Sequence, residues 1–128
     1  MDLFDRNSMS ADDVKQRIIQ ELVPGKQITL AHIIANPDPV LYKKLGLDPA
    51  VDYAASAIGV VTVSPAETAI IIGDIATKSS GVELGFLDRF SGTLIVTGRF
   101  SDVEAALNAL TSYCREVLGY SVVPITKT

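Results

Sequence analysis

The sequence predicts a single α+β domain with a ferredoxin-like layer of helices packed on an antiparallel sheet. Three observations support this prediction. From residue 57 onward the expected elements are a strand, a helix, two strands joined as a hairpin and a second helix, with a further strand and helix before them. The length of 128 residues is about the modal size of one domain. The mean hydropathy of +0.31 lies on the hydrophobic side of globular proteins, so we expect something to cover part of the surface.

Charge and cysteine content exclude several classes of function. The net charge is −4 and no cluster of Lys and Arg occurs, so the chain lacks the electrostatic footprint of nucleic-acid binding. A single cysteine cannot form an intrachain disulfide, and the acidic N-terminus does not resemble a secretory signal, which predicts a cytosolic compartment. Apolar runs of about five residues are far shorter than the roughly 20 that a membrane span needs.

The N-terminal region divides into two parts. Residues 1–13 carry a net charge of −3 and few apolar side chains, which predicts a flexible acidic tail without a fold. Residues 14–23 are ambiguous. Val14, Ile18 and Leu22 recur at the four-residue spacing of a helix, yet 17–23 is short and β-rich enough for a strand, and local reasoning slightly favours the helix.

The first regular elements follow Pro24-Gly25. Residues 27–35 are β-branched and apolar, which predicts a strand. Asp38 can accept hydrogen bonds from free N–H groups, Pro39 suits a first helical position, and Gly46 can end a helix in the left-handed conformation. A two-turn helix is therefore expected, followed by a connector over residues 47–56.

A buried strand and a helix come next. Residues 57–63 form a continuous apolar run of strand length. Ser64, Pro65 and Glu67 have the pattern of a helix N-cap, a first-turn proline and a capping-box acid, which predicts a helix over 65–80. Its apolar side chains occupy more than one stripe, so we expect contacts on more than one side of this helix.

The remaining pattern indicates a hairpin, a helix and an edge strand. Residues 82–88 and 93–99 are β-rich and are joined by a short loop that contains glycine, which predicts antiparallel pairing. Ser101 and Glu104 form a second capping box before the most amphipathic segment of the chain, which Gly119 ends. Residues 121–126 predict a strand at a sheet edge, because Pro124 cannot donate to a ladder.

Candidate catalytic and metal-ligating residues are few. His32 is the only histidine, and we interpret it as a hydrogen-bonded strand residue. Cys114 lies on the apolar stripe of the last helix, where a thiol behaves as a small hydrophobic group. No second histidine or nucleophile elbow accompanies them, so the sequence predicts no enzyme, no cofactor and no metal site.

Several motifs resemble the bacterial microcompartment shell domain (BMC domain). AIGVVTV at 57–63 resembles the first strand of the family, GDIATKSSGVELGF at 73–86 its helix end and second strand, and DRFSG at 88–92 the loop that faces a six-fold axis. KQITLAHIIANPDPVLYKKLG at 26–46 resembles the family's final strand and short helix, here placed before the first strand. This order is similar to that of the circularly permuted shell proteins of propanediol, ethanolamine and choline compartments.

The resemblance implies one permuted BMC domain over residues 14–128. In this subfamily the segment before VPGK is a strand, and six such strands form a small β-barrel over the pore of a hexamer. We therefore expect a barrel strand over 15–23 in place of the locally favoured helix. The candidate residues of this cap are Arg17, Ile18, Ile19, Gln20, Glu21, Leu22 and Val23.

The resemblance also implies two sets of site residues. The pore-lining candidates are Asp88, Arg89, Phe90, Ser91 and Gly92. Six phenylalanine side chains would form a hydrophobic constriction, whereas rings of the preceding aspartate or arginine would select by charge. A solvated hairpin tip is the alternative interpretation for those two charged residues.

The candidates for contacts at the hexamer edge are Lys78, its i,i+4 partner Asp74, and Asn36, which stands where the family has an arginine. An amide cannot form the forked contacts of a guanidinium, so weaker sheet formation or dependence on other shell proteins is expected. The alternative for Lys78 is an ordinary cation at the negative end of a helix dipole.

The function implied is a noncatalytic shell protein. Cyclic hexamers would tile a polyhedral coat around an enzyme core, in contact with other shell proteins and with encapsulated enzymes. The alternative is a small-molecule-sensing α+β regulatory domain, which would form dimers or tetramers and would be stabilised by its ligand.

Overall fold

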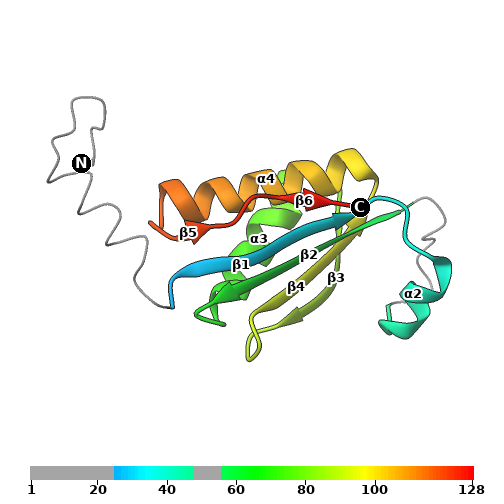
Figure 1. The fold of residues 1–128 in the computed structure, drawn as a ribbon, viewed down its shortest axis with the longest axis horizontal. Helices are drawn as coiled ribbons and strands as arrows, with labels where there is room; N and C mark the ends of the chain where they lie inside the picture. The colour runs from blue at the N-terminus through cyan, green and yellow to red at the C-terminus, as the bar shows by residue number, and fades with distance from the viewer. Residues whose placement is uncertain (1–24, 48–55) are drawn as a thin grey trace, which may run out of the picture.

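The computed structural model describes residues 25–47 and 56–128, and Figure 1 shows their arrangement. The predicted tail, the barrel strand and most of the predicted connector lie outside these residues. In chain order the elements are β1 (Gln27–Ile34), α2 (Pro39–Lys44), β2 (Ala57–Ser64), α3 (Thr68–Ser79), β3 (Glu83–Asp88), β4 (Thr93–Gly98), α4 (Phe100–Glu116), β5 (Ser121–Val122) and β6 (Thr126–Lys127).

The strands form one six-stranded sheet in the order β3-β4-β2-β1-β5, with β6 also pairing with β1. The β3–β4, β4–β2 and β2–β1 pairs are antiparallel, as expected. The prediction of an entirely antiparallel sheet is wrong, because β5 and β6 run parallel to β1. The physical reason is the connection from β4 to β5. Helix α4 returns the chain to the end of the sheet where β4 began, so β5 runs in the same direction as β4 and β1.

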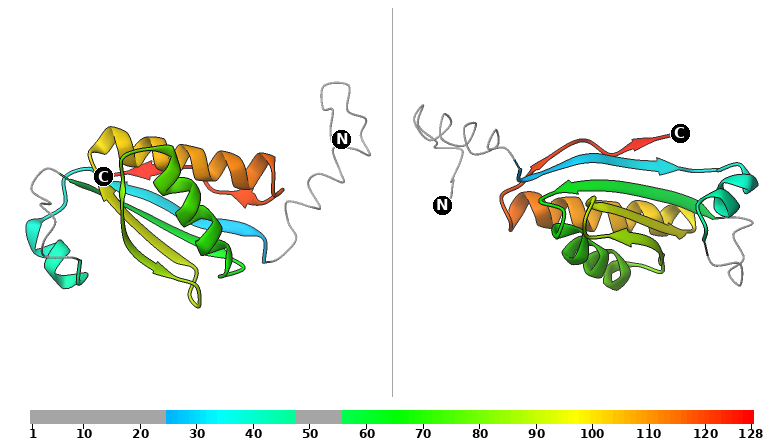
Figure 2. Two further views of the ribbon diagram at one scale, coloured as in Figure 1. Left: turned by 180° about the vertical axis from the view of Figure 1, so that it is seen from behind. Right: turned by 90° about the horizontal axis from the view of Figure 1, so that it is seen from below.

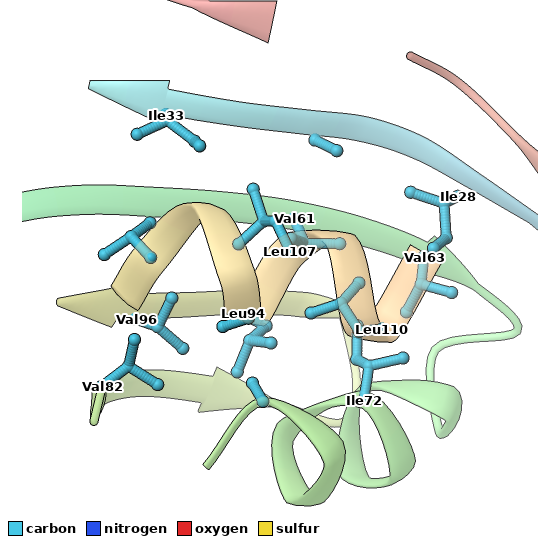
Figure 3. Packing of buried hydrophobic residues seen from close by; sticks show 14 of the residues in the cluster. Ile28, Ile33, Val61, Val63, Ile72, Val82, Leu94, Val96, Leu107 and Leu110 are labelled. Carbon is cyan, nitrogen blue, oxygen red and sulfur yellow. The ribbon is translucent and has the colours of Figure 1, made fainter. Parts of the chain in front are cut away.

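Helices α3 and α4 cover one face of the sheet (Figure 2). The core lies between these layers and is built from aliphatic side chains of both (Figure 3). Its fully buried members include Ile33 and Val61 from the sheet, Ile72 from α3, and Leu107 and Leu110 from α4. Gly59 lets α4 approach the sheet closely, since a Cβ there would lie 2.8 Å from Val103 Cγ1 and 2.9 Å from Leu107 Cδ1.

The predicted starts of both long helices need correction. Ser64 does not cap α3, because it pairs with Gln27 in the sheet and so extends β2. The peptide bond from Ser64 to Pro65 is cis, and α3 begins only at Thr68, after a turn. Helix α4 begins at Phe100, with no side-chain cap, so Ser101 already lies inside its first turn.

The short elements agree more closely with expectation. Asp38 caps α2, accepting a hydrogen bond from the Val40 N–H at 3.1 Å, and Gly46 has a φ of 70°. Residues 121–126 do lie at the sheet edge but form two short strands, with Pro124 in the gap between them. Proline lacks the N–H that a continuous ladder would need there. Among the helices of residues 25–47 and 56–128, none is long and apolar enough to cross a membrane.

Candidate functional site

The loop between β3 and β4 is a tight turn built around Asp88. The Phe90 N–H donates to the Asp88 carboxylate at 2.9 Å, and the Gly92 N–H donates to the Asp88 carbonyl oxygen at 2.9 Å. The hydrogen bond from the Phe90 backbone, and after it one from the Ser91 side chain, lower the pKa of Asp88. The carboxylate is therefore ionised and engaged by its own loop.

Gly92 ties this loop to the centre of the sheet. It adopts a left-handed φ of 77°, and its carbonyl oxygen accepts a hydrogen bond from the Val63 N–H of β2 at 2.8 Å. A Cβ at this position would overlap the carbonyl oxygen of Val63. The base of the hairpin is therefore fixed, and only glycine fits it without strain.

The tip of the same loop projects into solvent. Phe90 is 81% exposed, the largest exposed fraction among the large hydrophobic side chains in the described part of the chain. The Arg89 guanidinium lies over its ring, with Cζ 4.8 Å from the ring centroid, which is cation–π geometry. A cation stacked on an aromatic ring thus stands at the end of a rigid hairpin.

Helix α3 carries apolar side chains on two faces, of which only one is buried. The inner face is buried against the sheet and α4, and it comprises Thr68, Ala69, Ile72, Gly73 and Ala76. On the outer face Ile70 and Ile71 are 50% and 45% exposed. Nothing in the described part of one subunit covers these isoleucines, so the expected contact on a second side of this helix stays a prediction.

The outer face of α3 also carries the predicted ion pair. Lys78 Nζ lies 2.9 Å from Asp74 Oδ2, so this expected pairing is confirmed, and both side chains are well exposed. Asn36 is exposed as well, between the end of β1 and α2. Within the described residues no hydrogen bond or ion pair joins Asn36 to this pair, so one subunit alone does not bring the three edge candidates together.

The two residues considered for catalysis have structural roles. His32 Nδ1 lies 2.6 Å from Thr126 Oγ1 and its Nε2 lies 2.9 Å from Thr128 Oγ1, which confirms the hydrogen-bonded strand interpretation. Cys114 is fully buried, and burial raises the pKa of its thiol to about 11, so it is a core side chain. In the part of the chain that the structure describes, no group of three or more His, Cys, Asp or Glu could hold a metal ion.

The sequence did not predict the hydrogen-bond partners of His32, nor the hydrogen bond from the Phe90 N–H to the Asp88 carboxylate. The histidine contacts span 94 and 96 residues, and no local pattern indicates them. The turn around Asp88 had a usable signal, since aspartate two residues before an available N–H commonly accepts from it. The cap candidates, residues 17–23, lie outside the described residues.

Comparison with known proteins adds a family to this geometry. The BMC domain model matches residues 57–126. The shell protein PduU of Salmonella typhimurium is 52% identical over 120 residues, which cover 94% of this chain and all of PduU. The shell protein EutS of Escherichia coli is 49% identical, covering 89% of this chain and 98% of EutS. A solved structure described as a CutR flat hexamer is 45% identical, with a TM-score of 0.76 over 83% of this chain and 94% of that one.

Proposed function

Because this chain belongs to the BMC-domain family of bacterial microcompartment shell proteins, we propose that six copies form a flat ring that tiles such a shell in the bacterial cytoplasm. The observation that carries this proposal is the match to shell proteins over their whole length. Residues 25–47 precede the matched BMC segment, yet β1 pairs in the middle of the same sheet, which agrees with a permuted order of elements. The similarity to a hexameric structure supports six as the number of subunits.

The outer face of α3 supports assembly. A pair of half-exposed isoleucines is costly to leave in water, and a second subunit packed on them would recover that free energy. Lys78, Asp74 and Asn36 are the proposed contacts between neighbouring hexamers. Each is exposed, and the lysine and aspartate form an ion pair that contributes little to the stability of one subunit.

The hairpin loop 88–92 is the proposed lining of the central opening. Its fixed base suits a loop that must meet five copies of itself around an axis, because a rigid element is positioned more reproducibly than a long loop. Residues 15–23 are the proposed barrel that caps this opening. A ring of six strands gives each strand a partner on both edges, which one subunit cannot supply.

The proposed role is confinement without catalysis. The only histidine is hydrogen-bonded to two threonine hydroxyls, and the only cysteine is buried with a raised pKa. These contacts and this burial give both side chains structural roles. A tile that other shell proteins join at its edges would slow the escape of small intermediates from an enclosed enzyme core. The arrangement of helices on a sheet is also compatible with a small-molecule-sensing regulatory domain, but none of the relatives reported above is named as one.

Two observations by electron microscopy test this proposal. Purified protein should form six-fold rings, and because Asn36 stands where the family has an arginine, flat hexagonal arrays of these rings should need a high protein concentration. Isolated dimers would contradict the tile. A variant lacking residues 2–23 should keep the ring and show an open centre where the full chain shows density. If the centre of the ring looks the same in both proteins, the proposed cap is wrong, but the proposed hexameric tile is not affected.

A further inference from the structure

We propose that the ring of hairpin tips is a binding site for one compact multivalent anion, held by six Arg89 guanidinium groups. The inference rests on the proposed function, because it needs six copies of the hairpin around one axis. It adds a ligand class to the opening: a polyphosphate or polycarboxylate small enough to lie among the tips. The argument uses the charges of the loop, its rigidity and its symmetry.

The positive charge of the tip is available. Within residues 25–47 and 56–128, Arg89 forms no ion pair, and its guanidinium lies over the Phe90 ring. An aromatic ring supports a cation from one side and leaves the N–H donors at its edge free for a ligand. By contrast, Arg99 lies 3.6 Å from the Asp102 carboxylate.

The negative charge of the tip, on Asp88, is already hydrogen-bonded within the loop. The Asp88 carboxylate accepts the Phe90 N–H, and the causes that lower its pKa are chiefly hydrogen bonds of its own loop, with the Arg89 charge the smallest of them. Although each tip carries one acid and one base, the two are not equivalent toward a ligand. Asp88 is partly covered and Arg89 is exposed.

The fixed hairpin and the six-fold symmetry would turn one exposed arginine, which binds anions weakly, into a multivalent anion-binding site. A single exposed arginine binds an anion poorly, since water screens the interaction. Six guanidinium groups on hairpins fixed by Gly92 would meet one ligand at the axis, so each further contact is formed at high effective concentration. Guanidinium groups match phosphate and carboxylate oxygens in forked geometry, which favours a ligand with several such groups.

The test is titration calorimetry of the full-length protein with inorganic pyrophosphate at low ionic strength, with native mass spectrometry to count ligands. We expect one pyrophosphate per hexamer and an affinity that falls as salt is added. Arg89→Gln should weaken binding by at least about tenfold, as loss of forked charge-assisted contacts predicts. Arg115→Gln is the matched control, since it removes the same charge from an exposed position on α4 and should bind as the wild type does.

A second variant is expected to gain affinity, so the test does not depend only on a loss of binding that misfolding of Arg89→Gln could also cause. Asp88→Asn keeps an oxygen that can accept the Phe90 N–H but removes the negative charge, so it should bind pyrophosphate more tightly than the wild type. Opposite effects of the two neighbouring substitutions would support the site. A hexamer that binds no pyrophosphate, or binds it equally well in Arg89→Gln, overturns this inference and leaves the proposed function intact. Absence of the hexamer from the same spectra would refute both.

Discussion

Both faces of α3 carry isoleucine, but only the inner face is buried within one subunit. Ile72, on the inner face, is fully buried among β-strand and α4 side chains, whereas its neighbour Ile71 is 45% exposed. One subunit explains the inner face completely, because that face closes the core. It leaves the outer face unexplained. From this comparison we infer that the exposed isoleucines serve association with further copies of the chain.

Ile72→Ala against Ile71→Ala is the strongest test of this comparison, because both variants lose the same atoms one residue apart. The inner substitution should lower the free energy of unfolding by about 2–5 kcal/mol, through lost burial and the cavity left behind. The outer one should leave the fold intact and weaken association instead. Urea denaturation followed by circular dichroism measures the first effect. Equal losses in the two variants would break the distinction between the faces.

Gly92→Ala against Phe90→Ala extends the comparison to the hairpin. The alanine at 92 must adopt a left-handed φ and displace the Val63 carbonyl group, which should cost about 2 kcal/mol or more. Phe90 touches little within one subunit, so its replacement should change the unfolding free energy by less than about 0.5 kcal/mol. Thermal denaturation of the two variants would check this, and a large loss at position 90 would contradict the account.

The pH dependence of stability probes the inner layer at Cys114. Burial raises its pKa in the folded protein to about 11, above the ordinary thiol value of about 9, so the unfolded chain loses this proton first as pH rises. The contribution of the thiol to stability is therefore complete below pH 9 and is lost progressively between pH 9 and 11. Cys114→Ala should remove that part of the decline. Identical pH profiles of variant and wild type above pH 9 would contradict a protonated, buried thiol.

Lys78→Ala should have the smallest effect on folding. An exposed i,i+4 ion pair contributes only about 0.3–0.5 kcal/mol, so the unfolding curve should hardly move. The consequence should lie in contacts between hexamers, with flat arrays lost from micrographs while single rings remain. Lys43→Ala, which removes an exposed lysine from α2, is the control. If the Lys78 variant still forms arrays, this residue does not contribute to the contact between hexamers.

Local signals predicted most of the fold. The apolar run at 57–63, the Asp38 cap and the glycine-containing hairpin each act over a few residues, and each is found in the structure. What failed depended on distant partners. Ser64 has the features of a helix cap, but pairing with Gln27 extends β2 through it. The parallel strands at the sheet edge follow from the path of α4, which no local pattern encodes.

The candidate site was predictable to a lesser degree. Spacing alone paired Asp74 with Lys78, and the structure agrees. The family resemblance selected the hairpin tip, but only the geometry shows that Asp88 accepts a hydrogen bond from its own loop. It also shows that Arg89 stacks on Phe90 and forms no ion pair with the described residues. Such distinctions depend on backbone N–H directions, which the residue types do not determine.

The native mass of the purified full-length protein tests the central claim most directly, since the exposed isoleucines on the outer face of α3 are explained here by association into a ring. Six copies of the 13.6 kDa chain give about 82 kDa, and a single dominant species at that mass is expected. A stable dimer, a tetramer or a 13.6 kDa monomer would contradict the account.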